Sequence, residues 1–274
     1  MTAEKSESTA VAAARNTAVA ELPEYLRGAE EYAGLGNSRD AADNSMPFLA
    51  ILQKGSPQVN KQDPAYIKGA EAGMLLNTAT GQIWSGEDGI PVVPCGIQKN
   101  YVEWVPREKG GGYVATYPHD SRLPKEMGAV EDDRRRLVLP SGNHLVETLY
   151  TLGLLADGSP IVIGATSTAL KPMRDWMTAR NAQRLPSGKT APSFAKVYRL
   201  KTIWQKNDSG DWFGWKVFLE DGWTPANLFE PALEFAKQIA EHGVTIGRPV
   251  DDRVDSGASG GADTCHEGDD GIEL

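Results

Sequence analysis

The chain has little cysteine and no long apolar run, and both absences limit what it can be. Its 274 residues include two cysteines, Cys95 and Cys265, whose wide separation offers no disulfide framework. No apolar stretch approaches the roughly 20 residues that a membrane-spanning helix needs. The first 25 residues lack a basic start followed by an apolar core, so we expect no secretory signal. These absences predict a cytoplasmic protein without a membrane partner.

Recognisable catalytic and metal-binding motifs are also missing. The four histidines are scattered and lack the spacing of metal ligands. Ser187-Gly188-Lys189-Thr190 matches the end of a phosphate-loop motif, but Gln183 stands where that motif needs its leading glycine. No nucleophile elbow, HExxH pattern or paired-carboxylate motif is visible. We therefore expect a binding protein rather than an enzyme, with no cofactor and no metal.

Acidic residues outnumber basic residues, but the two signs are unevenly distributed. The formal net charge is −9. Residues 1–45 carry a charge of −4 and residues 249–274 carry −7, whereas residues 165–220 hold ten Lys or Arg against four Asp or Glu. A cationic centre between anionic ends hints at a nucleic-acid partner.

Composition divides the chain into three parts. Residues 1–45 are rich in Ala, Ser, Glu and Asn and show no lasting apolar stripe, which predicts a flexible arm. Residues 46–248 are predicted to form one ordered domain. Residues 249–274 are dominated by Gly, Ser, Asp and Ala, which predicts a disordered acidic tail. Acidic and apolar side chains at its tip are predicted to bind a partner, although the tail could also serve solubility alone: Asp269, Asp270, Ile272, Glu273 and Leu274.

The central domain is predicted to be mostly β. Gly73–Trp84 and His144–Ser167 each have the pattern of two strands around a turn, and Ile90–Val105 is rich in β-branched and aromatic residues. Three stretches are predicted to be helical, the first as a short docked helix: Pro47–Gln53, Pro172–Gln183 and Thr224–His242. Roughly eight to ten strands with few helices fit an elaborated oligonucleotide-binding (OB-like) antiparallel β barrel with disordered termini.

The segment Lys196–Leu219, KVYRLKTIWQKNDSGDWFGWKVFL, combines aromatic and cationic residues in one predicted hairpin. Asn-Asp-Ser-Gly supplies the turn between its two strands. Alternate residues of a strand face opposite sides, so Trp204 and Lys201 lie on different faces of the first strand. Rings that stack on bases, interleaved with cations that meet phosphates, are typical of a platform for single-stranded nucleic acid. The alternative is that the rings fill the core and the cations form a solvated face.

From this pattern we predict a groove that binds single-stranded DNA. Stacking on bases is assigned to aromatic residues of the hairpin and of the strand before it: Tyr101, Trp104, Trp204, Trp212 and Trp215. Contacts to phosphates are assigned to the cations of the central region: Lys171, Arg174, Arg180, Lys189, Lys196, Arg199, Lys201 and Lys216. We expect no more than half of the aromatic residues to touch bases, because the core needs the others.

Six runs of the domain carry a resemblance to a known family. They are GMLLNTATGQIW, VVPCGIQKNYVEWVPR, KGGGY, HLVETLY, IVIGATSTALKPMRDWMT and APSFAKVYRLKTIWQKN. Together they resemble a family of tailed-bacteriophage early-region proteins that is associated with phage single-stranded DNA-binding proteins. The resemblance covers Pro47–Phe235. The tail is similar to that of single-stranded DNA-binding proteins, but it ends with Leu274 rather than phenylalanine.

This resemblance implies an OB barrel that coats single strands during phage DNA replication or recombination in the host-cell cytoplasm. Its acidic tail is expected to recruit replication or recombination proteins and to compete with DNA for the cationic groove. A second hypothesis is a phage structural or accessory module that binds proteins and not DNA. A third is a nuclease-like or recombination enzyme, for which no convincing set of metal carboxylates is present. Homo-oligomerisation stays open.

Overall fold

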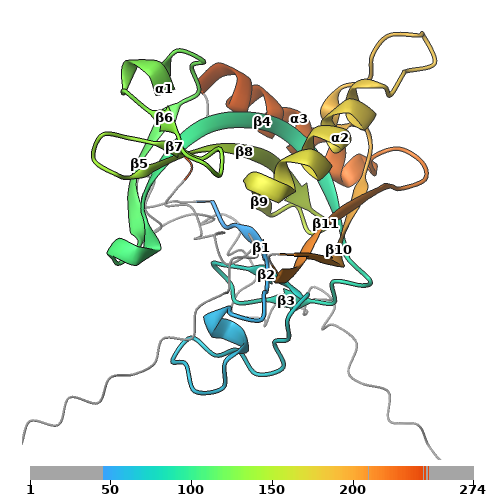
Figure 1. The fold of residues 1–274 in the computed structure, drawn as a ribbon. Coiled ribbons are helices and arrows are strands. Elements are labelled where there is room, and N and C mark those ends of the chain that lie inside the picture. The colour runs from blue at the N-terminus through green and yellow to red at the C-terminus, as the bar shows by residue number, and fades with distance from the viewer. Residues whose placement is uncertain (1–45, 209, 243, 245, 247–274) are drawn as a thin grey trace, which may run out of the picture. The chain divides into compact units, whose positions relative to one another are not determined.

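The described part of the chain is mostly β, with antiparallel sheets and few helices (Figure 1). The computed structural model describes residues 46–246 except 209, 243 and 245. The predicted arm, residues 1–45, and the predicted tail, residues 249–274, lie outside the described residues. Within the described residues the main sheet curls into half a barrel, which confirms the predicted mostly β, antiparallel fold class.

A small three-stranded sheet opens the described part of the chain. It consists of β1 (Leu49–Ile51), β2 (Leu75–Asn77) and β3 (Ile83–Trp84), which pair antiparallel in that order. The hairpin predicted at Gly73–Trp84 is confirmed as β2 and β3. The helix predicted at Pro47–Gln53 is wrong, because this run forms β1 and buries Leu49 and Ile51. An apolar run this short is compatible with a helix or a strand, and pairing with β2 makes it a strand.

The main sheet has eight strands and is built on two long partners, β4 (Ile90–Val105) and β8 (His144–Leu155). Their pairing is antiparallel and extends over nearly the whole of both strands. β8 continues into β9 (Pro160–Ala165) through a turn in which Gly158 has a φ of 83°, which confirms that predicted hairpin. Five shorter or outer strands complete the sheet: β5 (Gly112–Pro118), β6 (Val130–Glu131), β7 (Leu137–Val138), β10 (Tyr198–Asn207) and β11 (Gly210–Leu219).

Two irregularities bend the main sheet. The register between β4 and β8 shifts between Pro94 and Gly96, and the register between β4 and β5 shifts between Glu103 and Trp104. Bulges of this kind bend a strand and increase its twist. β4 accordingly follows an arch in Figure 1. One end of β4 pairs with β10 and the other with β5, so the β10–β11 hairpin lies at one end of the curved sheet.

Two long helices cover the sheet and give it packed clusters on both faces. α2 (Leu170–Asn181) joins a cluster that contains Val92 of β4, and α3 (Ala226–His242) joins another that contains Val93. Neighbouring residues of a strand point to opposite faces, so β4 is buried on both. The helices predicted at Pro172–Gln183 and Thr224–His242 are confirmed as α2 and α3. No described helix is long and apolar enough to cross a membrane. The remaining helical pieces are short: α1 (Leu123–Glu126), η3 (Pro57–Val59), η4 (Arg107–Lys109), η5 (Ser167–Ala169) and η6 (Ser193–Ala195).

Candidate nucleic-acid interface

The predicted hairpin is formed by β10 and β11, and its register divides the side chains between two faces. The two strands pair antiparallel over all ten residues of each. Residues that are directly paired lie on the same face, so Tyr198, Leu200 and Trp215 share the inner face, where all three are buried. We call the opposite face the outer hairpin face, and it consists of Arg199, Lys201, Ile203, Gln205, Trp212, Lys216 and Phe218.

Two lysines stand directly opposite each other on the outer hairpin face. Lys201 of β10 is paired in register with Lys216 of β11. Neither side chain forms an ion pair with any residue that the structure describes. Like charges that face each other across a strand pair destabilise a sheet. The hairpin therefore carries an electrostatic cost that a bound polyanion would relieve.

Apolar side chains lie beside this lysine pair. Phe218 is 40% exposed and Ile203 is 39% exposed. The centroid of the Phe218 ring lies 5.8 Å from Nζ of Lys201 and 5.1 Å from Nζ of Lys216, both within cation–π range. Trp212 lies further along the same face and is partly buried. Positive charge and flat apolar area thus occur together, as a surface for single-stranded nucleic acid requires.

Arg199 is the third cation of the outer hairpin face, and its charge is shared with protein groups. Its Nε donates a hydrogen bond to the carboxylate of Glu220 and forms an ion pair with it. Its Nη1 lies 3.5 Å from the carbonyl oxygen of Gly89. Because Glu220 already neutralises Arg199, we expect Lys201 and Lys216 to dominate contacts with an anion.

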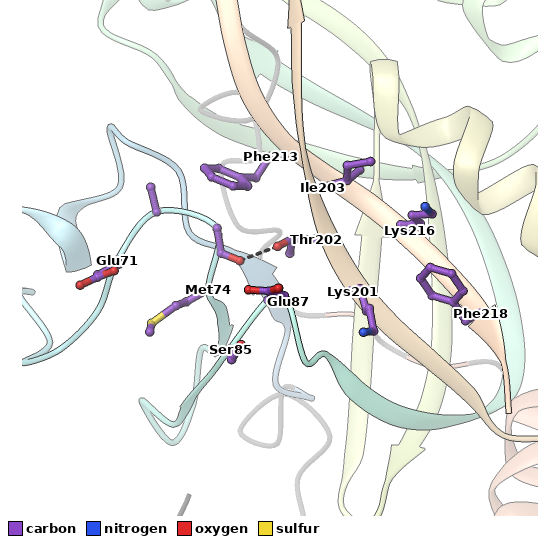
Figure 2. A pocket seen from close by; sticks show the side chains of 13 residues that line it. Glu71, Met74, Ser85, Glu87, Lys201, Thr202, Ile203, Phe213, Lys216 and Phe218 are labelled. Atoms are coloured by element: carbon purple, nitrogen blue, oxygen red, sulfur yellow. Dashed lines mark hydrogen bonds between the residues drawn. The ribbon is translucent and has the colours of Figure 1, made fainter. Parts of the chain in front are cut away.

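A groove of about 490 Å³ runs beside the outer hairpin face. Figure 2 shows Lys216 and Phe218 on the hairpin side of the groove and Glu71 on the loop side. Glu87, from the turn before β4, also lines the groove. Lysines attract a phosphate and carboxylates repel it, so the charges favour the hairpin side for the backbone of a bound strand.

Hydrogen bonds hold the hairpin against the loop side of the groove. The backbone nitrogen of Thr202 donates to the carbonyl oxygen of Gly86 at 2.9 Å. The hydroxyl of Thr202 donates to the carbonyl oxygen of Gly73 at 2.6 Å (Figure 2). The side-chain amide of Gln53 donates to the carbonyl of Phe213 at 2.8 Å and accepts from its backbone nitrogen at 2.9 Å. These contacts set the separation of the two groove walls.

Gly86→Ala is expected to destabilise the fold by about 1–3 kcal/mol, because Gly73 and Thr202 pack so closely against Gly86 that no space is left for a Cβ atom. Such an atom would lie 1.9 Å from the carbonyl oxygen of Gly73 and 2.1 Å from the hydroxyl oxygen of Thr202. Urea unfolding followed by circular dichroism measures the change. Gly214→Ala is the matched control, because the atoms nearest to its Cβ would belong to the flexible end of the Gln205 side chain. Equal losses in the two variants would contradict the close contact at Gly86.

Four residues that were predicted to contact DNA are buried away from the outer hairpin face. Tyr101 stacks on His119 with ring centroids 5.1 Å apart, and Trp104 is 4% exposed. Trp215 lies in the core cluster of the inner face, and Arg180 is buried near the end of α2. A base or a phosphate has no access to a buried side chain, so these four residues are left out of the interface.

Three predicted cations lie on α2 or in the loop after it. Lys171 forms an ion pair with Asp175, and Arg174 forms one with Glu147, each at 3.2 Å. Lys189 is exposed in the loop. None of the three belongs to the outer hairpin face, and two of them are already paired with carboxylates.

The last two predicted residues lie at opposite ends of the hairpin. Trp204 is 52% exposed near the tip, and its Nε1 donates to the carboxylate of Asp211 at 3.1 Å. Lys196 precedes β10, donates to the carbonyl oxygen of Gly222 at 2.6 Å and lies 4.0 Å from the centroid of the Trp223 ring. Trp204 is on the inner-face register, and neither residue joins the lysine pair.

The structure therefore brings four of the predicted residues together on the outer hairpin face: Arg199, Lys201, Trp212 and Lys216. Sequence reasoning missed Phe218 and Ile203 as members of this surface. The signal for Phe218 is the period of two along β11, in which Trp212, Lys216 and Phe218 occupy alternating positions. The predicted partner-binding tip lies outside the described residues: Asp269, Asp270, Ile272, Glu273 and Leu274.

Comparison with known proteins gives a match over most of the chain. A family model described as Pam3 phage gp34-like protein matches residues 14–245. No curated protein and no solved structure matches the chain. The matched range includes the whole β10–β11 hairpin and the loops on the other side of the groove.

Proposed function

The chain belongs to the Pam3 phage gp34-like protein family, and from this premise we propose that it is a phage single-stranded DNA-binding protein. It acts without catalysis, in phage DNA replication or recombination. The observation that carries the proposal is the pair formed by half-buried Lys201 and exposed Lys216, whose like charges face each other across the two strands beside Phe218. A phosphate backbone supplies the negative charge that this pair lacks.

In this proposal the bound strand lies along the hairpin side of the groove. Its phosphates meet Lys201 and Lys216, and its bases stack on Phe218 and Trp212. Stacking of a base on one aromatic ring contributes about 1–3 kcal/mol, and it tolerates any sequence because every base has a flat face. The surface therefore favours single strands, whose bases are free to stack, over duplex DNA.

The acidic tail is proposed to recruit replication or recombination proteins and to compete with DNA for the same cations. Residues 249–274 carry a charge of −7, which complements the lysine pair. If the tail competes, a chain that ends at residue 248 binds DNA more tightly than the full chain in the titration below. Equal affinities of the full and the shortened chain for DNA would contradict competition by the tail. That result would not contradict DNA binding by the outer hairpin face.

Titration with oligo(dT) is expected to quench the intrinsic tryptophan fluorescence of the protein, because Trp212 lies on the outer hairpin face, where the bases are proposed to stack. The logarithm of the affinity should fall linearly with the logarithm of the salt concentration. Two neutralised phosphates of a single strand give a slope of about −1.4. A duplex of the same length is the control, and we expect it to bind more weakly.

Absence of quenching at low salt would contradict the proposal. It would favour the second hypothesis, a phage structural or accessory module that binds proteins. Magnesium-dependent cleavage of the oligonucleotide would instead contradict the non-catalytic part of the proposal and leave the binding part in place. The two parts are therefore tested separately by the same mixture of protein and DNA.

A further inference from the structure

β11 forms one end of the main sheet, so only one of its two edges has a strand beside it. The strand order begins with β11 and continues to β10, and no other described strand pairs with β11. The strand has ten residues and contains no proline. A long edge strand of this kind is a template on which a further strand can pair. The proposed function makes no use of this edge.

The direction of the backbone groups along this edge follows from the hydrogen bonds of one residue. Phe213 directs both its N–H and its C=O to the side chain of Gln53 and therefore not to β10. In an antiparallel pair this direction alternates from one residue to the next. Trp215, Val217 and Leu219 therefore also point their N–H and C=O groups away from β10.

The outward backbone groups of these three residues have no partner among the described residues. None of the three makes a backbone hydrogen bond outside the pairing with β10, whereas Gln53 satisfies the corresponding groups of Phe213. We call residues 215–219 the open edge of β11. A row of unpaired main-chain groups gives affinity for an extended peptide that adds to the sheet as a strand.

A second pocket, of about 380 Å³, lies along the open edge, between β11 and α2. Its lining includes Trp215, Val217 and Leu219, whose side chains belong to the inner face, and Lys216, whose side chain belongs to the outer hairpin face. Because the lining comes from both faces of the strand, the pocket reaches the edge. α2 supplies the other wall, which includes Trp176. Alternate side chains of an added strand would therefore point towards α2.

The charge of the open edge favours an acidic strand over a second copy of β11. If two open edges paired antiparallel about Val217, the two copies of Lys216 would be diagonal neighbours on the same face. Diagonal neighbours lie about 7–8 Å apart, within reach of long side chains, so this pairing would add to the repulsion between Lys201 and Lys216. A strand with a carboxylate opposite Lys216 would relieve that repulsion.

The tail of the chain contains a segment with the required pattern. Residues 249–274 lie outside the described residues and carry a charge of −7. Near their end, Glu273 separates Ile272 from Leu274. A strand of this sequence has two large apolar side chains on one face and a carboxylate on the other. No other part of residues 249–274 has two large apolar residues on either side of a single acidic residue.

We propose that residues 272–274 bind the open edge of β11 as an added antiparallel strand of the main sheet. Glu273 lies opposite Lys216 on the outer hairpin face and forms an ion pair with it. Ile272 and Leu274 lie on the other face, where their side chains pack towards α2. The N–H and C=O groups of these two residues pair with the open groups of β11.

The chain between the domain and this segment is long enough for the contact. Ile246 is the last described residue, and it packs against a core cluster that contains Phe48 and Tyr150. The 25 residues from 247 to 271 span about 25–30 Å on average as a flexible chain and about 80 Å when extended. A segment attached in this way has an effective concentration in the millimolar range, so weak pairing is enough to occupy the edge.

The inference adds a place to the tail competition in the proposed function. With Glu273 paired to Lys216, one of the two lysines of the outer hairpin face is no longer available to a phosphate. A strand of DNA must then displace residues 272–274 to reach it. The pairing of the tail with β11 requires no DNA, so it is tested without DNA.

The test is hydrogen exchange of single amides by nuclear magnetic resonance, in the full chain and in a chain that ends at residue 270. We expect the N–H groups of Trp215 and Val217 to exchange about tenfold more slowly in the full chain, because the added strand accepts their hydrogen bonds. Lys216 and Phe218 are the matched control, because their N–H groups point to β10 and should exchange equally in both chains.

Two single variants locate the contact and change the tail alone. Glu273→Lys places a like charge opposite Lys216, and we expect it to remove most of the slowing at Val217. Glu267→Lys changes the charge of the tail by the same amount outside the added strand, and we expect it to keep the slowing. Equal losses in the two variants would assign the effect to the general charge of the tail and would overturn the proposal.

Two further results would overturn it. One is equal exchange of Val217 in the full and the shortened chain. The other is slow exchange that persists in the shortened chain and increases with protein concentration, since that result would assign the open edge to a second copy of the chain. Failure of the proposed function has a different signature, because a chain that shows the tail-dependent slowing and does not bind oligo(dT) would contradict DNA binding alone.

Discussion

Replacing Lys201 and Lys216 together by glutamate is expected to weaken oligo(dT) binding by about 100-fold or more at physiological salt. Each change removes a cation that would meet a phosphate. Each also adds a carboxylate to a groove that Glu71 and Glu87 already line. The anisotropy of a labelled oligonucleotide measures the affinity, and the salt dependence of the remaining binding should become shallower by about 1.4 in slope.

The matched control for this variant is a pair of lysines elsewhere on the surface. Lys61 and Lys125 are exposed and form no ion pair with a described residue, and replacing both by glutamate changes the net charge by the same amount. Lys125 belongs to α1, which Figure 1 shows well apart from β10 and β11. Similar losses in both double variants would indicate a general charge effect and not a site.

The single variant Lys216→Glu separates binding from stability. It places a carboxylate directly opposite Lys201, and an opposite-charge pair across two strands contributes about 0.2–1 kcal/mol. We therefore expect this variant to unfold at a higher urea concentration than the natural chain and to bind oligo(dT) more weakly. A gain in stability together with a loss of affinity would indicate that the lysine pair serves ligand binding and destabilises the fold.

Trp215→Ala is expected to lower the free energy of unfolding by about 3–5 kcal/mol. The ring is 6% exposed and packs in a cluster with Met173 and Leu200. Its removal leaves a cavity between α2 and the hairpin, as well as losing the buried apolar area. Urea unfolding followed by circular dichroism measures the loss directly.

Trp212→Ala is the contrasting variant on the other face of the same strand. We expect it to change stability by less than about 1 kcal/mol, since the ring is only partly buried. Its affinity for oligo(dT) should fall by about 1–3 kcal/mol, the contribution of one stacked base. If Trp215→Ala instead spared the fold and removed DNA binding, the assignment of inner and outer faces would be incorrect.

The strands and the longer helices could be predicted because local signals and tertiary packing agree. Asp157-Gly158-Ser159 joins two β-branched runs, and the turn forms at that point with Gly158 at positive φ. α3 ends at His242, where the apolar stripe of its sequence stops, as expected from the helix-stop signal in the sequence. Pro47–Gln53 has no such second signal. Its structure is decided by pairing with β2, a strand that is distant in the sequence.

The residues of the candidate binding surface were harder to predict, because the burial of a hairpin residue depends on whether another element covers its face of the hairpin. Trp204 and Trp215 are both tryptophans of the hairpin, and the register places both on the inner-face side. The inner face is covered near Trp215 and open near Trp204, which alternation alone does not reveal. Arg180 shows the same limit, since an arginine at a helix end is exposed by default. Only the packing of α2 on the sheet buries it.

The hydrogen bonds between Gln53 and Phe213 join residues that are 160 positions apart in the sequence. The hydrogen bond between Thr202 and Gly73 joins residues that are 129 positions apart. Contacts of such high sequence separation form late, because the ends of a long loop must first meet. During synthesis the groove cannot close until β11 has left the ribosome. Affinity for a ligand in this groove therefore reports on completion of the chain through β11, and a shortened fragment would lose it together with its native shape.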